Sequence, residues 1–166
     1  KGIARIAGIT TGQVVDAGIR DSMNMGAAMA PAAFHTVMQN LKDLEITKKQ
    51  LESGWYDKII TGDLGKIGKQ ALAEFIRNEG LEAEEFLMDC GMEIYDSSAQ
   101  DTHAGGSGCG CSALVLGALI LPNIQAGIWR RVLFIPTGAL LSTVSFNEGQ
   151  TIPGIAHGII LEGMGK

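Results

Sequence analysis

Short apolar runs alternate with helix-like stretches along the chain, and this alternation constrains the fold more than any other feature of the sequence. Strands are predicted at 3–10, 56–61, 86–90, 131–136 and 153–162, and helices at 31–44, 67–78 and 112–126. Alternating strands and helices predict the α/β class, with a mainly parallel sheet and helices on its faces. Because the last strand follows the fourth without a helix between them, we expect it to run antiparallel.

The predicted helices differ in their apolar patterns. Apolar residues recur at helical spacing within 31–44, which indicates one buried stripe. Thr47 and Gln50 have the spacing of a capping box, which predicts a short additional turn of helix. The stretch 112–126 is apolar nearly all round, so we predict that it is the most buried helix. The inward-facing residues of the second helix are predicted to be Ile67, Leu72, Phe75 and Ile76.

Composition excludes several classes of protein. The formal net charge is -5, there is no basic block and aromatic residues make up 5% of the chain, which excludes a typical nucleic-acid-binding surface. The longest apolar run, 113–121, is too short to span a membrane, and we expect no signal peptide. The three cysteines are an odd number that fits a reducing compartment. The length suits one domain, and because the chain opens at Lys1 with a strand-like run, we expect a fragment of a longer protein.

Residues 101–113 gather more chemistry than any other stretch, because an aspartate, a histidine and two cysteines stand among glycines. A helix starting near Ser107 or Cys109 would point free N–H groups into this loop, attracting an anion and favouring a thiolate. Asp63 and Cys90 lie at or just beyond the ends of predicted strands. Ligands of open α/β sheets bind beyond such strand ends. We predict that one pocket at this edge binds a ligand. Its candidate residues are Asp63, Cys90, Asp101, His103, Ser107, Cys109 and Cys111.

Other interpretations of the same residues stay open. The glycines could serve packing alone, and Asp63 could simply cap a helix. A Cys-His-Asp set could act in nucleophilic catalysis. A zinc site from His103, Cys109, Cys111 and Cys90 is disfavoured because the Cys109-x-Cys111 spacing suits one tetrahedral ion poorly, so we expect no metal and no cofactor. His35 and His157 are interpreted as structural histidines. The long irregular segment 137–151 lies between two strands, and ordered loops of this length are often functional.

The longest distinctive segments of the chain carry a family resemblance. They are 21–26, 61–65, 101–113, 136–142, 145–150 and 152–157, and they span most of the sequence. These segments resemble the C-terminal half of the stage V sporulation protein AD family, which is similar in fold to thiolases and ketoacyl synthases. The resemblance implies that residues 1–166 form one thiolase-like half-domain, with a five-stranded mixed sheet between helices. It also implies that the helix at 112–126 packs on its counterpart in a second half.

The resemblance further implies a function in a spore-forming bacterium. A member of this family is expected to bind dipicolinic acid, alone or with calcium, and to support its uptake into the developing spore. The implied partners are the other stage V sporulation A membrane proteins. The implied location is soluble or peripheral, at the inner membrane of the spore or forespore. The fold is also compatible with a homodimer.

The wider enzyme family implies an alternative, an acyltransferase with a cysteine nucleophile. In that family the catalytic cysteine lies on the N-terminal half, which is not part of this chain. Ketoacyl synthases carry a histidine motif after the second strand of the C-terminal half, where this chain reads Thr61-Gly62-Asp63-Leu64. They also carry a Gly-Asn-Thr-Ser loop, where this chain reads Gly105-Gly106-Ser107-Gly108. We therefore expect a binding protein rather than an enzyme.

Overall fold

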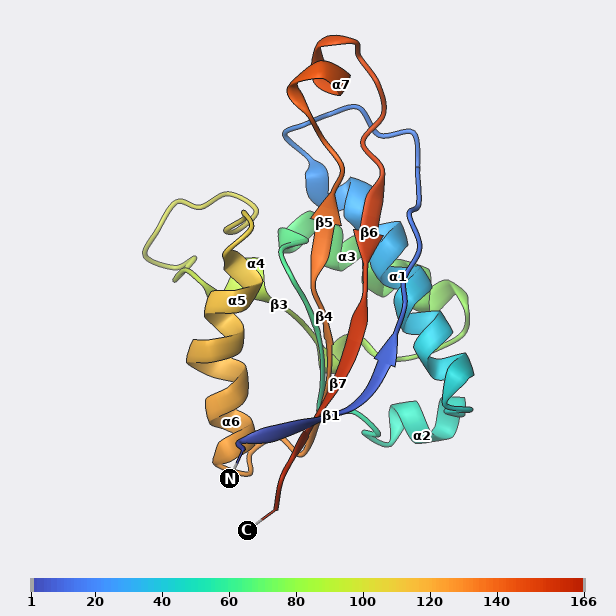
Figure 1. The fold of residues 1–166 in the computed structure, drawn as a ribbon, viewed down its shortest axis with the longest axis vertical. Coiled ribbons are helices and arrows are strands. Elements are labelled where there is room, and N and C mark those ends of the chain that lie inside the picture. The colour runs from blue at the N-terminus through green and yellow to red at the C-terminus, as the bar shows by residue number, and fades with distance from the viewer. Residues whose placement is uncertain (1, 166) are drawn as a thin grey trace.

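A five-stranded sheet forms the centre of the computed structural model, which describes residues 2–165 (Figure 1). Strands β2, β3 and β4 are parallel to one another, and β7 runs antiparallel to both β4 and β1. Four strands therefore point one way and the last points the other, which confirms the predicted mixed α/β sheet. In sheet order the strands are β1 (Ala4–Thr10), β7 (Gly158–Gly163), β4 (Arg131–Ile135), β2 (Lys58–Thr61) and β3 (Leu87–Asp89).

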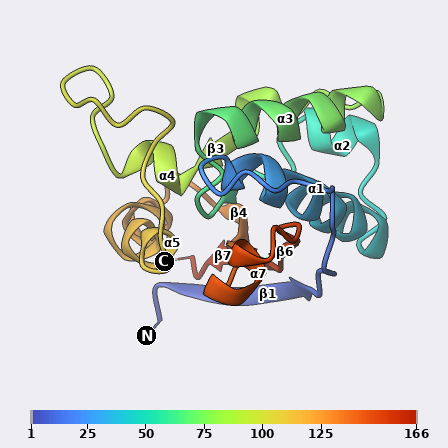
Figure 2. The same ribbon diagram turned by 90° about the horizontal axis from the view of Figure 1, so that it is seen from above.

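Helices cover both faces of this sheet (Figure 2). Helices α1 (Met25–Asp43) and α3 (Gly65–Asn78) pack together on one face. On the other face lies one continuous helix, made of α5 (Cys111–Val115), the π-helical turn η2 (Leu116–Ile120) and α6 (Leu121–Gln125). The alternation of side chains along each strand creates a core on each side, so that Ile59 faces α1 and α3 while Ile60 faces α5 and α6. No helix within residues 2–165 is long and apolar enough to cross a bilayer.

Shorter helices complete the connections: α2 (Lys48–Glu52), η1 (Glu84–Phe86) and α4 (Cys90–Glu93). The predicted capping box is confirmed, since Thr47 and Gln50 each bond the backbone of the other at the start of α2. Helix α1 begins at Met25, earlier than predicted, and includes Pro31. The alanine-rich sequence around that proline favours helix strongly enough to carry α1 through it.

Two burial predictions are wrong. Ile67 is 51% exposed, because it lies in the first turn of α3, beyond the end of the sheet. The α5–α6 helix is not the most buried one, since Leu114 is 57% exposed while α1 buries more of its side chains. The α5–α6 helix alone does not cover the whole of its face of the sheet. Ile6 of β1 pairs with Leu161 on that face and remains largely exposed.

The segment after β4 is more regular than predicted. Strands β5 (Thr137–Ala139) and β6 (Gly154–Ala156) form a separate antiparallel hairpin, with α7 (Thr143–Asn147) at its tip (Figure 1). The single strand predicted over 153–162 is therefore divided at His157 into β6 and β7. The alternation of glycine with other residues in β5 and β6 lowers their strand propensity, which hides the hairpin from sequence reasoning.

A strap of residues 11–20 ties β1 to the hairpin and leads into α1. The Gly12 N–H donates to Nδ1 of His157, which confirms a structural role for this histidine. A Cβ at Gly12 would lie 1.5 Å from the Ala156 carbonyl oxygen, so only glycine allows this close approach. The Val15 N–H donates to the Gly154 carbonyl, and the Gly154 N–H donates to the Val15 carbonyl. These contacts fix where the chain enters residues 21–26.

Candidate ligand-binding cleft

A cleft of about 870 Å³ opens at the carboxyl end of the parallel strands. Its walls come from the segments that follow β2 and β4, from the start of α1 and from the glycine loop before α5. Ligands of open α/β sheets bind at this edge. The main lining segments are 21–26, 63–65, 104–109 and 136–139.

Asp89 is the buried anchor beneath this cleft. Its carboxylate accepts hydrogen bonds from the Thr61 hydroxyl (2.6 Å) and from the backbone N–H groups of Leu64 (2.9 Å), Gly65 (2.9 Å) and Gly91 (3.1 Å). Burial raises the pKa of Asp89, while these hydrogen bonds oppose the shift. One side chain thus holds the turn between β2 and α3 against the end of β3.

Asp63 lies at the tip of the turn that Asp89 holds. Its Oδ1 accepts from the Thr137 hydroxyl at 2.9 Å, and its own N–H donates to the same hydroxyl oxygen at 3.1 Å. Its Oδ2 accepts from the Gly108 N–H at 3.1 Å. Asp63 therefore joins three walls of the cleft: the β2–α3 turn, the start of β5 and the glycine loop.

The glycine loop is fixed by close backbone contacts. The Gly106 N–H donates to the Gly91 carbonyl at 2.6 Å, and a Cβ at Gly105 would lie 2.5 Å from that same oxygen. The helix after the loop begins at Cys111, later than the predicted start near Ser107 or Cys109. The Gly108 N–H within the loop is directed to the Asp63 carboxylate, so an anionic group of the protein itself occupies the predicted anion-attracting corner.

The three cysteines have different environments. Cys90 is fully buried at the start of α4, and burial, helped by the charge of Asp89, raises its pKa to about 12. Cys111 is also buried, its pKa is raised by burial, and its Sγ lies 3.6 Å from the Gly62 carbonyl oxygen. The expectation that the corner formed by residues 101–113 favours a thiolate is therefore wrong for Cys111. Cys109 is exposed and lines the cleft.

Asp101 and His103 lie outside the cleft. They belong to the loop 96–103, which forms its own shallow hollow, and both side chains are almost fully exposed. At the start of this loop the Asp96 carboxylate accepts from the backbone N–H and the hydroxyl of Ser98, which forms a local turn. The prediction that all candidate residues share one pocket is therefore wrong, although a ligand-binding role for Asp101 and His103 stays a prediction. The predicted residues that line the cleft are Asp63, Ser107 and Cys109.

Sequence reasoning missed two residues that build the cleft. Asp89 is the last residue of β3, and a polar residue at the end of a buried strand is the signal that could have identified it. Thr137 directly follows Pro136 at the end of β4, in the segment predicted to be irregular. The zinc alternative also loses support, because His103 is exposed and Cys90 is buried. Within residues 2–165 no three His, Cys, Asp or Glu side chains are grouped to hold a metal ion.

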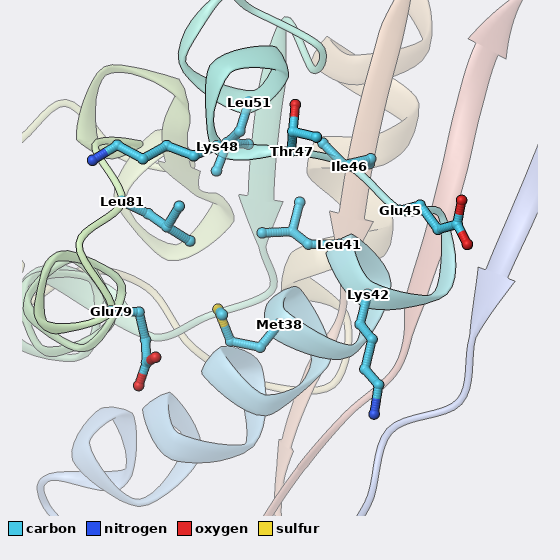
Figure 3. Close-up of a pocket in the computed structure, with 10 residues that line it drawn as sticks. All are labelled: Met38, Leu41, Lys42, Glu45, Ile46, Thr47, Lys48, Leu51, Glu79 and Leu81. Atoms are coloured by element: carbon cyan, nitrogen blue, oxygen red, sulfur yellow. The ribbon is translucent and has the colours of Figure 1, made fainter.

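A second, smaller pocket of about 350 Å³ lies at the opposite ends of α1 and α3 (Figure 3). Its floor is apolar, with Leu41, Ile46 and Leu51 buried there. Charged residues of both signs surround it, among them Lys42 and Glu79. The pocket lies away from the carboxyl ends of the parallel strands, so the cleft is the better candidate site.

Comparison with known proteins places the chain in a family. Residues 1–162 match the family described as stage V sporulation protein AD. The chain is 41% identical over 164 residues to stage V sporulation protein AD of Bacillus subtilis (strain 168), covering 99% of the chain and 47% of that protein, so it spans about half the length of this relative. A solved ketosynthase, in complex with its chain length factor, from Xenorhabdus doucetiae aligns with a TM-score of 0.44 and 12% identity, over 98% of this chain and 80% of that one. The chain belongs to the stage V sporulation protein AD family.

Proposed function

We propose that this chain is part of a sporulation protein that binds dipicolinic acid, free or as its calcium complex, and supports its uptake into the developing spore. The observation that carries the proposal is a convergence of segments. Four stretches that carry the family resemblance, 21–26, 61–65, 101–113 and 136–142, each contribute residues to the one cleft. A ligand-binding role explains why stretches so distant in sequence meet there.

The cleft has suitable groups for a flat aromatic dicarboxylate. Hydroxyl groups of Ser107, Ser112 and Thr137 lie among its lining residues and can donate to carboxylate oxygens. Met25 and Met29 add apolar surface against which a ring can pack. Among the described lining residues the charged side chains are Asp21 and Asp63. The ligand's charge must therefore be balanced by bound calcium or by protein outside this chain.

We further propose that residues 1–166 form the C-terminal half-domain of a longer protein with two related halves. The length of the Bacillus subtilis relative, of which the chain covers 47%, supports this organisation. The rest of such a protein would supply a further wall of the cleft. The other stage V sporulation A membrane proteins would be its partners, at the inner membrane of the spore or forespore, and a homodimer is compatible with the proposal.

Calorimetry tests the proposed ligand directly. Dipicolinate would be titrated, with and without calcium, into the chain alone and into the longer protein. We expect saturable heat with the longer protein and weaker or no heat with the chain alone, because an incomplete cleft leaves part of the ligand in water. Isophthalate, which keeps both carboxylates but lacks the ring nitrogen, is the control ligand. Equal binding of isophthalate, or no saturable heat with dipicolinate, would contradict a dipicolinate site.

Cys109 supports a second candidate function, acyl transfer. Its exposed Sγ lies in the cleft, where a thiolate could attack a thioester, form an acyl-cysteine and release the thiol of coenzyme A. Intact-protein mass after exposure to acyl-coenzyme A separates the two functions. An adduct that disappears in Cys109→Ser would favour the transferase, whereas an unmodified mass favours the binding protein.

A further inference from the structure

We propose that Asp63 competes with the ligand for the hydrogen-bond donors of the cleft and thereby sets its selectivity for charge. The inference rests on the proposed function, because it concerns the same cleft and an anionic ligand. The carboxylate of Asp63 would then occupy the place of an anionic ligand group, and a ligand carboxylate would have to displace it from the donors.

The contacts of Asp63 carry this inference. Its two carboxylate oxygens take the Thr137 hydroxyl proton at 2.9 Å and the Gly108 N–H at 3.1 Å. Both donors belong to residues that line the cleft, on two different segments of its wall. The Thr137 oxygen also accepts the Asp63 N–H, so the hydroxyl proton is directed to the carboxylate. Two hydrogen-bond donors that a ligand could use are thus already bonded to the carboxylate of Asp63.

Asp63 is held in this position from below. The neighbouring N–H groups of Leu64 and Gly65 are fixed by the buried Asp89, which leaves the turn little freedom to move. Asp63 is close enough to Asp89 for its negative charge to raise the pKa of Asp89. This arrangement places negative charge beneath the cleft, while Asp21 adds another carboxylate at its lining.

A second carboxylate cannot share these donors. An ionised carboxylate only accepts hydrogen bonds, so a ligand carboxylate and Asp63 cannot both be satisfied by one hydroxyl proton or one N–H. Like charges brought together also repel one another. A neutral ligand of the same shape has amide N–H groups that can donate to Asp63 instead. The cleft should therefore discriminate between dipicolinate and its neutral diamide in a way that depends on Asp63.

The test compares two variants and two ligands in the longer protein, with calcium removed by a chelator. Asp63→Asn keeps the size of the side chain and an acceptor for Gly108, but it removes the charge and frees the Thr137 hydroxyl. Asp43→Asn is the control, because Asp43 is an exposed carboxylate at the far end of α1, outside the cleft, where it accepts from Gln39. The ligands are dipicolinate and pyridine-2,6-dicarboxamide, measured by calorimetry.

We expect Asp63→Asn to bind dipicolinate about tenfold more tightly than the wild type, equal to about 1.4 kcal/mol. The diamide should gain nothing, and Asp43→Asn should change dipicolinate affinity by less than about twofold, because its charge is remote from the cleft and screened. Unchanged or weaker dipicolinate binding by Asp63→Asn, or an equal gain for both ligands, would overturn the inference while leaving the proposed function intact. If none of the three proteins binds dipicolinate without calcium but they bind it once calcium is restored, this inference fails and the proposed function stands. If none of them binds it under either condition, both fail.

Discussion

At the scale of single residues, two carboxylates show how environment decides the role of a side chain. Asp89 and Asp101 are the same residue type and lie near one another in the sequence. Asp89 is buried and accepts hydrogen bonds from four donors, whereas Asp101 is exposed in a loop. The contrast follows from position. Asp89 ends a buried strand, while Asp101 belongs to a loop that turns away from the sheet.

Asp89→Asn should destabilise the chain by about 2–3 kcal/mol, because the amide NH₂ would face backbone donors and leave buried groups unsatisfied. Urea unfolding at neutral pH measures the change. Asp101→Asn is the control and should shift the unfolding free energy by less than about 0.5 kcal/mol. Equal effects of the two substitutions would show that Asp89 is not the anchor of the β2–α3 turn.

Glu162 on β7 provides the pH-dependent prediction. Its carboxylate accepts from Arg131 and Arg5, both at 2.7 Å, and these partners lower the pKa of Glu162. A carboxyl group with a lowered folded pKa stabilises the fold above its ordinary pKa and loses that contribution as pH falls through the folded value. We expect Glu162→Gln to cost about 1 kcal/mol at pH 7.

That difference between wild type and Glu162→Gln should shrink as the solution is acidified below the ordinary pKa of glutamate. Urea midpoints measured from neutral to acidic pH would follow it. Glu74→Gln, at an exposed position of α3, is the control and should show no comparable trend. A difference that stays constant down to acidic pH would mean that the ion pairs do not cause the stabilisation.

At the scale of elements, sequence patterns predicted what depends on periodicity and missed what depends on tertiary contacts. All five strands of the main sheet and the capping box of α2 follow from local sequence. The β5–β6 hairpin is held by the strap through Gly12 and Val15, which no local pattern indicates. His103 lines a different hollow from Cys109, so their grouping in the sequence did not predict a spatial one.

The α5–α6 helix offers a prediction at this scale, since its two faces differ. Leu116 packs against the core below the sheet, while Leu114 is mostly exposed. Leu116→Asp should abolish soluble expression of the chain, because a charge would be forced into apolar surroundings. Leu114→Asp is the matched control. When residues 1–166 are expressed alone, this variant should be as soluble as the wild type. Normal expression and an unchanged melting curve for Leu116→Asp would contradict this packing.

At the scale of the whole molecule, the cleft and the partly open sheet face point to one organisation. Segments far apart in sequence converge on the carboxyl edge of the sheet, while apolar residues of β1 and α5 remain exposed. If a second half packs on the α5–α6 helix, as the family resemblance implies, Leu114→Asp should become disruptive in the longer protein although it is tolerated in this chain. The fold of this chain follows from its alternating pattern, whereas the rest of the site would come from the second half that we propose.

Blocking Cys109 tests most directly whether the ligand binds in the cleft. Cys109 is the exposed cysteine of the chain and lines the cleft, while Cys90 and Cys111 are buried and should react slowly. The longer protein would be alkylated with iodoacetamide, checked by mass and titrated with dipicolinate, with Cys109→Ser treated identically as the control. The account predicts that dipicolinate binding is lost or weakened at least about tenfold in the alkylated wild type, a change of about 1.4 kcal/mol, and is retained in the treated Cys109→Ser protein. Undiminished binding after complete alkylation of Cys109 would contradict it.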